Sequence, residues 1–149
     1  MAREEGTIPK NLMFGMAAHA MSAGARARMV EWAQFLGGYV GLPVGVIGAP
    51  SYEALADMVR KHEVDLAWLP PIPFIALERT KMAVPLVQNH RLGQAQFQSV
   101  MIVRGDARVR TLVGLRGKRV AWVDPLSASG YVLPRIQMAA LGIDPRTLF

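Results

Sequence analysis

Strand-like and helix-like hydrophobic patterns alternate along this chain of 149 residues. Short apolar or β-branched runs are followed by stretches in which apolar residues recur every three or four positions, as on one face of a helix. Strands separated by helices of about 10–15 residues are typical of an α/β fold with a largely parallel sheet. Ligands of such folds bind beyond the carboxyl ends of the strands, so the turns at those ends are the first places to search for a site.

The patterns predict where each element lies. The predicted strands are 11–18, 42–49, 64–69, 97–103 and 119–123. The predicted helices are 25–39, 52–62, 73–79 and 128–141, with a brief helical turn at 112–115. Ser51 is expected to cap the helix 52–62, because a serine before a helix accepts a hydrogen bond from an amide of its first turn.

Basic charge is concentrated in the last third of the chain. The formal net charge is +6, and residues 104–149 carry +5 of it. Such a field raises the local concentration of anions, although a solvated basic surface explains it equally well. The arginines are scattered among few aromatic residues, so no nucleic-acid partner is expected. Charge density rises and the strand signal stops between Val103 and Arg110, so we expect a domain boundary there.

Several classes of chemistry are absent from the sequence. Without cysteine there is no disulfide, thiolate zinc site or cysteine nucleophile. The chain has no Walker loop, dinucleotide-binding glycine motif or nucleophile elbow, and its histidines lack metal-ligand spacing, so neither an enzyme nor a cofactor is expected. No run approaches the roughly 20 apolar residues of a membrane span. The polar start is not a secretory signal, which leaves open an intracellular protein or one whose leader has been removed.

A serine-rich turn joins the last predicted strand to the last predicted helix. It reads Val120-Ala-Trp-Val-Asp-Pro-Leu-Ser-Ala-Ser-Gly-Tyr131. Free amides and hydroxyls at the positive end of a helix dipole favour a tetrahedral oxyanion such as phosphate or phosphonate. Serines that cap the helix and bind nothing would give the same pattern.

Three aromatic residues lie near predicted strand ends or helix starts. Tyr52 begins the helix after Ser51, where its phenol either donates to a ligand or packs against the chain. Trp68 and Trp122 lie near the carboxyl ends of strands, where each either forms the wall of a pocket or packs in the core.

Several motifs, taken together and in order, resemble those of the phosphonate, phosphite and phosphate substrate-binding proteins of ABC importers. They run through the chain from about residue 12 to residue 149. The motifs are Ser51-Tyr-Glu-Ala-Leu, Val64-Asp-Leu-Ala-Trp-Leu69, Phe97-Gln-Ser-Val-Met-Ile-Val-Arg104, Leu115-Arg-Gly-Lys and Val123-Asp-Pro-Leu-Ser-Ala-Ser-Gly-Tyr131, followed by Pro134 and Gly142-Ile-Asp-Pro145.

The resemblance implies a periplasmic-binding-protein type II-like fold, with a three-layer αβα first lobe and the beginning of a second. It makes residues 1–103 the first α/β lobe and residues 104–149 a hinge and the incomplete start of the second. The ligand of that family lies in the cleft between the lobes. Ser127, Ala128 and Ser129 match the turn that grips the phosphono oxygens, and Tyr52 matches a tyrosine that contacts them. Phe97 falls where many members have a second tyrosine, so one hydroxyl donor is missing here. Pro70-Pro71 replaces a more usual glycine-containing turn and lacks amide donors.

The family also implies a small oxyanion ligand, an ABC permease as partner, and a periplasmic or lipid-anchored location. Its members are roughly twice as long as this chain, so a fragment, a domain-swapped or homodimeric assembly, and a shortened homologue are all open. A ligand-sensing or interaction module inside the cell, built on the same fold but not coupled to transport, is the alternative function.

Overall fold

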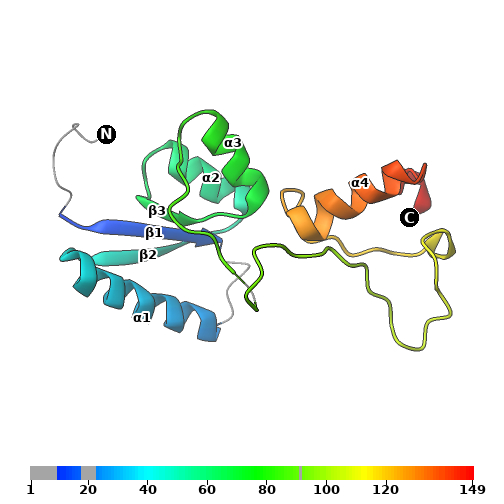
Figure 1. Cartoon of the computed structure of the whole chain (residues 1–149), viewed down its shortest axis with the longest axis horizontal. Helices are drawn as coiled ribbons and strands as arrows, with labels where there is room; N and C mark the ends of the chain where they lie inside the picture. The colour runs from blue at the N-terminus through cyan, green and yellow to red at the C-terminus, as the bar shows by residue number, and fades with distance from the viewer. Residues whose placement is uncertain (1–9, 18–22, 91) are drawn as a thin grey trace. The chain divides into compact units, whose positions relative to one another are not determined.

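The computed structural model describes residues 10–17, 23–90 and 92–149. Its contacts divide the chain into two compact units, Met1–Val84 and Pro85–Phe149, which are described separately (Figure 1). This division falls before the expected boundary after Val103, because residues 85–103 contain no regular strand in the described part of the chain. The assignment of 1–103 to a first lobe stays a prediction.

The first unit is built on a three-stranded parallel sheet. Its strands are β1 (Leu12–Ala17), β2 (Val44–Ala49) and β3 (Leu66–Trp68), in the order β2-β1-β3. In the register of the sheet, Ala17 pairs with Ala49 and Met16 pairs with Trp68, so all three strands end at one edge. The predicted strands 11–18, 42–49 and 64–69 are therefore confirmed with shortened ends, except that Ala18 lies outside the described residues.

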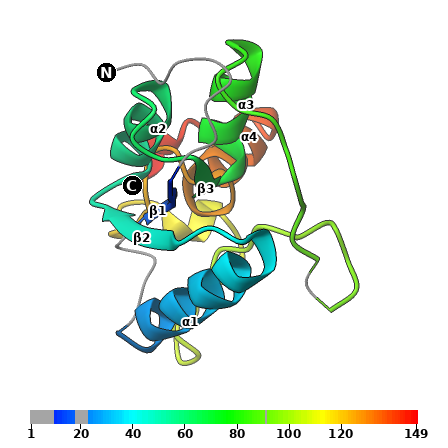
Figure 2. The same cartoon turned by 90° about the vertical axis from the view of Figure 1, so that its left-hand side faces the viewer.

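Helices cover both faces of this sheet. Helix α1 (Ala23–Val40) lies on one face, and α2 (Tyr52–Arg60) and α3 (Pro71–Arg79) lie on the other (Figures 1 and 2). The alternation of side chains along β1 explains this arrangement. The ring of Phe14 lies 4.8 Å from that of Trp32 in α1, whereas a Cβ atom at the next residue, Gly15, would lie 2.9 Å from Leu55 in α2. The expected three-layer αβα architecture is confirmed.

Local sequence signals set the ends of the helices. Gly41 adopts a φ of 72°, and its amide donates to the carbonyl of Gly37 at 2.9 Å, which ends α1. Ser51 caps α2 as predicted, because its hydroxyl oxygen accepts from the Ala54 amide at 3.0 Å. Helix α3 begins at Pro71, before the predicted start at Pro73, because proline is favoured in the first turn of a helix.

The second unit contains only helical elements among its described residues. They are the 3₁₀ turn η2 (Val113–Leu115), the π-helical turn η3 (Ala128–Val132), α4 (Leu133–Ala140) and α5 (Pro145–Leu148). The predicted helix 128–141 is thus divided into η3 and α4.

The predicted strands 97–103 and 119–123 are wrong. Their β-branched and apolar residues favour an extended chain, but a strand also needs a neighbour with which to exchange hydrogen bonds. Within the described residues, the segment 119–123 makes one such loop hydrogen bond, from the Val123 amide to the Gly130 carbonyl at 3.3 Å. Segment 97–103 pairs with no strand there.

In the part of the chain that the structure describes, no helix is both long enough and apolar enough to cross a bilayer.

Candidate functional site

The serine-rich turn is held by hydrogen bonds that converge on Ser127. The carbonyl of Ser127 accepts from the amides of Tyr131 at 3.1 Å and Val132 at 3.0 Å. Its hydroxyl oxygen accepts from the Gly130 amide at 3.1 Å, and its own amide donates to Asp124 O at 2.8 Å. Ser127 is only 7% exposed, so its main role in this structure is to cap η3.

Two amides of the turn have no acceptor in the part of the chain that the structure describes. Neither the Ala128 nor the Ser129 amide donates to an acceptor among the residues that the structure describes. They are the first amides of η3, which by position have no partner within the helix. The side chain of Ser129 likewise forms no hydrogen bond within the described chain, and Ser129 is exposed. These two amides and one hydroxyl are the donors that the turn can offer to an anion.

Gly130 allows the turn to lie directly against the preceding segment. A Cβ atom there would lie 2.7 Å from Cβ of Val123 and 3.1 Å from Oγ of Ser127. Heavy atoms do not approach this closely without displacement, so only glycine fits without a shift of the backbone. The glycine therefore permits both the Val123–Gly130 hydrogen bond and the cap.

A second segment reaches the turn through Ser99. Its hydroxyl donates to the carbonyl of Ser129 at 2.5 Å. Ser99 was not predicted from the sequence as a site residue. Its signal is the two-residue spacing from Phe97, because side chains two positions apart project from the same side of an extended chain. Phe97 itself is 55% exposed, and its ring is therefore accessible within the second unit.

Trp122, for which two roles were open, belongs to an aromatic cluster beside the turn. Its ring centroid lies 5.5 Å from that of Tyr131 and 5.8 Å from that of Phe149, both edge to face. The guanidinium carbon of Arg135 lies 4.9 Å from the Tyr131 ring centroid and 5.9 Å from that of Trp122. Arg135 was also missed; its sequence signal is the four-residue spacing from Tyr131.

Tyr52 and Trp68 belong to the first unit, at the edge where its strands end. Tyr52 is the first residue of α2, directly after β2 and Ser51, and is partly buried. Trp68 is the last residue of β3 and is 52% exposed. Pro70 precedes α3 and Pro71 begins it, so the missing amide donors expected at these two prolines fall at the start of the helix. Pro73 also lacks an amide, which leaves that of Ile72 in this stretch.

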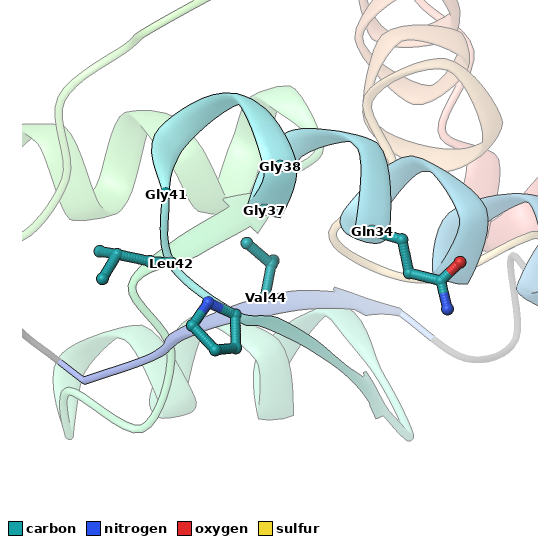
Figure 3. A pocket seen from close by; sticks show the side chains of 7 residues that line it. Gln34, Gly37, Gly38, Gly41, Leu42 and Val44 are labelled. Carbon is teal, nitrogen blue, oxygen red and sulfur yellow. The ribbon is translucent and has the colours of Figure 1, made fainter.

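Two hollows among the described residues lie away from these side chains. One of about 440 Å³ lies where α1 ends and β2 begins, and is lined by Gln34, Gly37, Gly38, Gly41, Leu42, Pro43 and Val44 (Figure 3). It contains no charged group and faces the amino end of β2, opposite to the edge that carries Tyr52 and Trp68. A second hollow of about 370 Å³, where α4 meets α5, contains Asp144 and Arg146, which are paired with each other. Neither is a candidate site.

No cluster of three histidine or acidic side chains that could hold a metal ion occurs among the described residues. The side-chain and backbone hydrogen bonds from Arg146 hold the pKa of Asp144 below its ordinary value. This pair lies on the surface and stabilises the start of α5.

Comparisons with known proteins agree on one family. Residues 14–149 match the family model described as "ABC transporter, phosphonate, periplasmic substrate-binding protein". The phosphonates-binding periplasmic protein of Escherichia coli (strain K12) is 26% identical over 130 residues, which cover 84% of this chain and 38% of that protein. A binding protein component of a phosphonate ABC transporter from Pseudomonas aeruginosa has a similar structure, with a TM-score of 0.70 and 22% identity, covering 93% of this chain and 48% of that one. The chain thus spans less than half the length of these relatives.

Proposed function

Because the chain belongs to the family of phosphonate periplasmic substrate-binding proteins of ABC transporters, we propose that it binds phosphonate or a related phosphorus oxyanion for import. The ligand's oxygens are held at Ser127, Ala128 and Ser129. An ABC permease is the partner, the periplasm is the location, and no chemical step is catalysed. The relatives support the class of ligand, since both are named for phosphonate.

The observation that carries this proposal is the set of unused donors in the turn. The Ala128 and Ser129 amides have no acceptor within the described residues, and the Ser129 hydroxyl is exposed. Successive backbone amides at the start of a helix bind tetrahedral anions, because their N–H groups and the helix dipole both favour negative charge. The excess of basic residues in 104–149 adds a positive electrostatic field, which also attracts anions.

The roles of the remaining residues follow from the family's use of two lobes. Tyr52 matches a tyrosine that contacts the phosphono oxygens in the family, and we assign it to ligand binding; Trp68, at the carboxyl edge of the sheet, is assigned to an apolar wall of the site. Phe97 lies where a tyrosine is usual and contributes ring contact without a hydroxyl. These assignments rest on the resemblance, on the exposure of Trp68 and Phe97, and on the position of Tyr52 at the start of α2.

Titration calorimetry of the full chain with phosphate, phosphite, methylphosphonate and 2-aminoethylphosphonate tests the proposal. Ser129→Ala removes a hydroxyl without touching the cap made by Ser127. We expect it to weaken binding by about 1.5–3 kcal/mol, or roughly 10- to 150-fold in Kd, as for a hydrogen bond to a charged group. Thr80→Ala is the control, because it removes a hydroxyl that donates, among the described residues, only to the Ala76 and Leu77 carbonyls at the end of α3.

Two results would contradict the proposal. No heat with any of the four anions would mean that this chain does not bind them. Binding that Ser129→Ala leaves at the wild-type value would move the site away from the turn. Genes for a permease and an ATPase beside this one would favour transport, whereas their absence, together with location inside the cell, would favour the ligand-sensing module.

A further inference from the structure

Arg135 is placed beside the turn by the helix that the turn begins. It lies in the first turn of α4, four residues after Tyr131, so both side chains project from the same side of the chain. Its guanidinium carbon is 4.9 Å from the Tyr131 ring centroid and 5.9 Å from that of Trp122. Both distances are within the range of a cation–π interaction.

The charge of Arg135 is not neutralised by an ion pair. The ion pairs of the described second unit join Arg104 to Asp106 and Arg146 to Asp144, and Arg135 takes part in none. A guanidinium stacked on aromatic rings keeps its positive charge while its position is restricted. Arg135 therefore contributes a positive charge of restricted position against Tyr131 and Trp122, beside the turn. Asp144 balances part of this charge without a direct ion pair, because, besides Arg146, Arg135 is one of the groups that lower the pKa of Asp144.

The same side chain is also linked to the hydrogen bonds that shape the turn. Tyr131 supplies the ring on which Arg135 stacks, and its amide donates to the Ser127 carbonyl at 3.1 Å. Trp122 contacts Tyr131 from the segment that precedes the turn and contacts Phe149 from the end of the chain. Movement of Arg135 would thus release the Tyr131 ring from one of its contacts.

We propose that Arg135 is a positioning residue of the anion site, which holds the turn through Tyr131 and Trp122 and raises its affinity for oxyanions through an unpaired charge. The proposal rests on the function proposed above. It gives Arg135 two separable contributions, since stacking depends on the planar guanidinium and the field depends only on the charge. Lysine preserves the second and weakens the first, whereas methionine removes both.

Calorimetric titration of the full chain with inorganic phosphate and methylphosphonate at several salt concentrations measures the contribution of charge. We expect Arg135→Met to weaken binding roughly 3- to 10-fold at low salt, as for one charge near but not touching the anion. The loss should shrink as salt rises, and Arg135→Lys should recover most of it. Arg116→Met is the control, because it makes the same change in net charge at an exposed arginine that forms no ion pair within the described chain.

Hydrogen exchange at the Tyr131 and Val132 amides, in the absence of ligand, measures the contribution of stacking. We expect both amides to exchange several-fold faster in Arg135→Met and in Arg135→Lys, while the control retains the wild-type rates. A role in overall stability alone would weaken binding equally at all salt concentrations and would give no recovery with lysine.

The outcomes separate this inference from the proposed function. If wild-type chain binds and Arg135→Met binds equally well, the role of Arg135 is refuted and the function stands. If wild-type chain binds none of the four anions named for the proposed function, that function fails, and the exchange rates still decide whether Arg135 holds the turn. Unchanged exchange in both variants would refute that part.

Discussion

Replacement of Gly130 by alanine tests the geometry of the serine-rich turn most directly. The added Cβ would lie 2.7 Å from Cβ of Val123 and 3.1 Å from Oγ of Ser127. Both neighbours belong to the turn or to the segment against it, and the first is a rigid, β-branched side chain. The turn can accept the methyl group only by moving away from Val123, which strains or breaks the hydrogen bonds at 3.1 and 3.3 Å that join these residues.

The expected cost is that of inserting one methyl group into a packed site, about 1–3 kcal/mol. Hydrogen exchange at the Tyr131 and Val132 amides reports it, because both donate to the Ser127 carbonyl. Local opening free energies lowered by this amount give roughly 5- to 150-fold faster exchange. Anion affinity should fall with it, since the donors of Ala128 and Ser129 depend on the same turn.

Gly38→Ala is the matched control for this substitution. Gly38 lies inside α1, and a Cβ atom there meets nothing within 4 Å. Alanine should therefore slow exchange in α1, by the equivalent of about 0.5–1 kcal/mol, because it is the better helix former. Wild-type exchange at Tyr131 and Val132 in Gly130→Ala would refute the close approach of the turn to Val123.

Two further predictions concern the stability of each unit. Leu55 of α2 is 0% exposed and packs against Gly15 of β1. Leu55→Ala should therefore lower the free energy of unfolding of the first unit by about 2–5 kcal/mol, measured by urea unfolding followed by circular dichroism. A loss below about 1 kcal/mol would contradict this packing. The hydrogen bonds from Arg146 lower the pKa of Asp144 from its ordinary 3.8, so the stabilisation they give is present above that pH and is lost as pH falls through the lower, folded-state value. Carboxyl titration by NMR should show this lowered midpoint, and Arg146→Met should return it toward the ordinary value.

Features that depend on neighbours in sequence were predictable. The hydrophobic period located the strands and helices of the first unit, and Ser51 marked the start of α2. The serine-rich turn was also recognisable, because a short apolar run, two serines and a helical pattern follow one another within a few positions. Hydrogen bonds that span three or four residues determine all these features, so local composition is sufficient.

What required the tertiary structure is the set of contacts between distant residues. Apolar, β-branched runs at 97–103 and 119–123 predict extended chain, yet whether a strand forms depends on a hydrogen-bonding neighbour that no local pattern supplies. Ser99 reaches Ser129 across 30 positions, and Trp122 meets Phe149 from the other end of the unit. The local pattern therefore determined the α/β class with its parallel sheet and the existence of the turn, while the three-layer arrangement was expected only from the resemblance. Only the folded chain decided that Ser127 is used as a cap while Ala128 and Ser129 keep their donors, because hydrogen bonds are assigned by proximity in space.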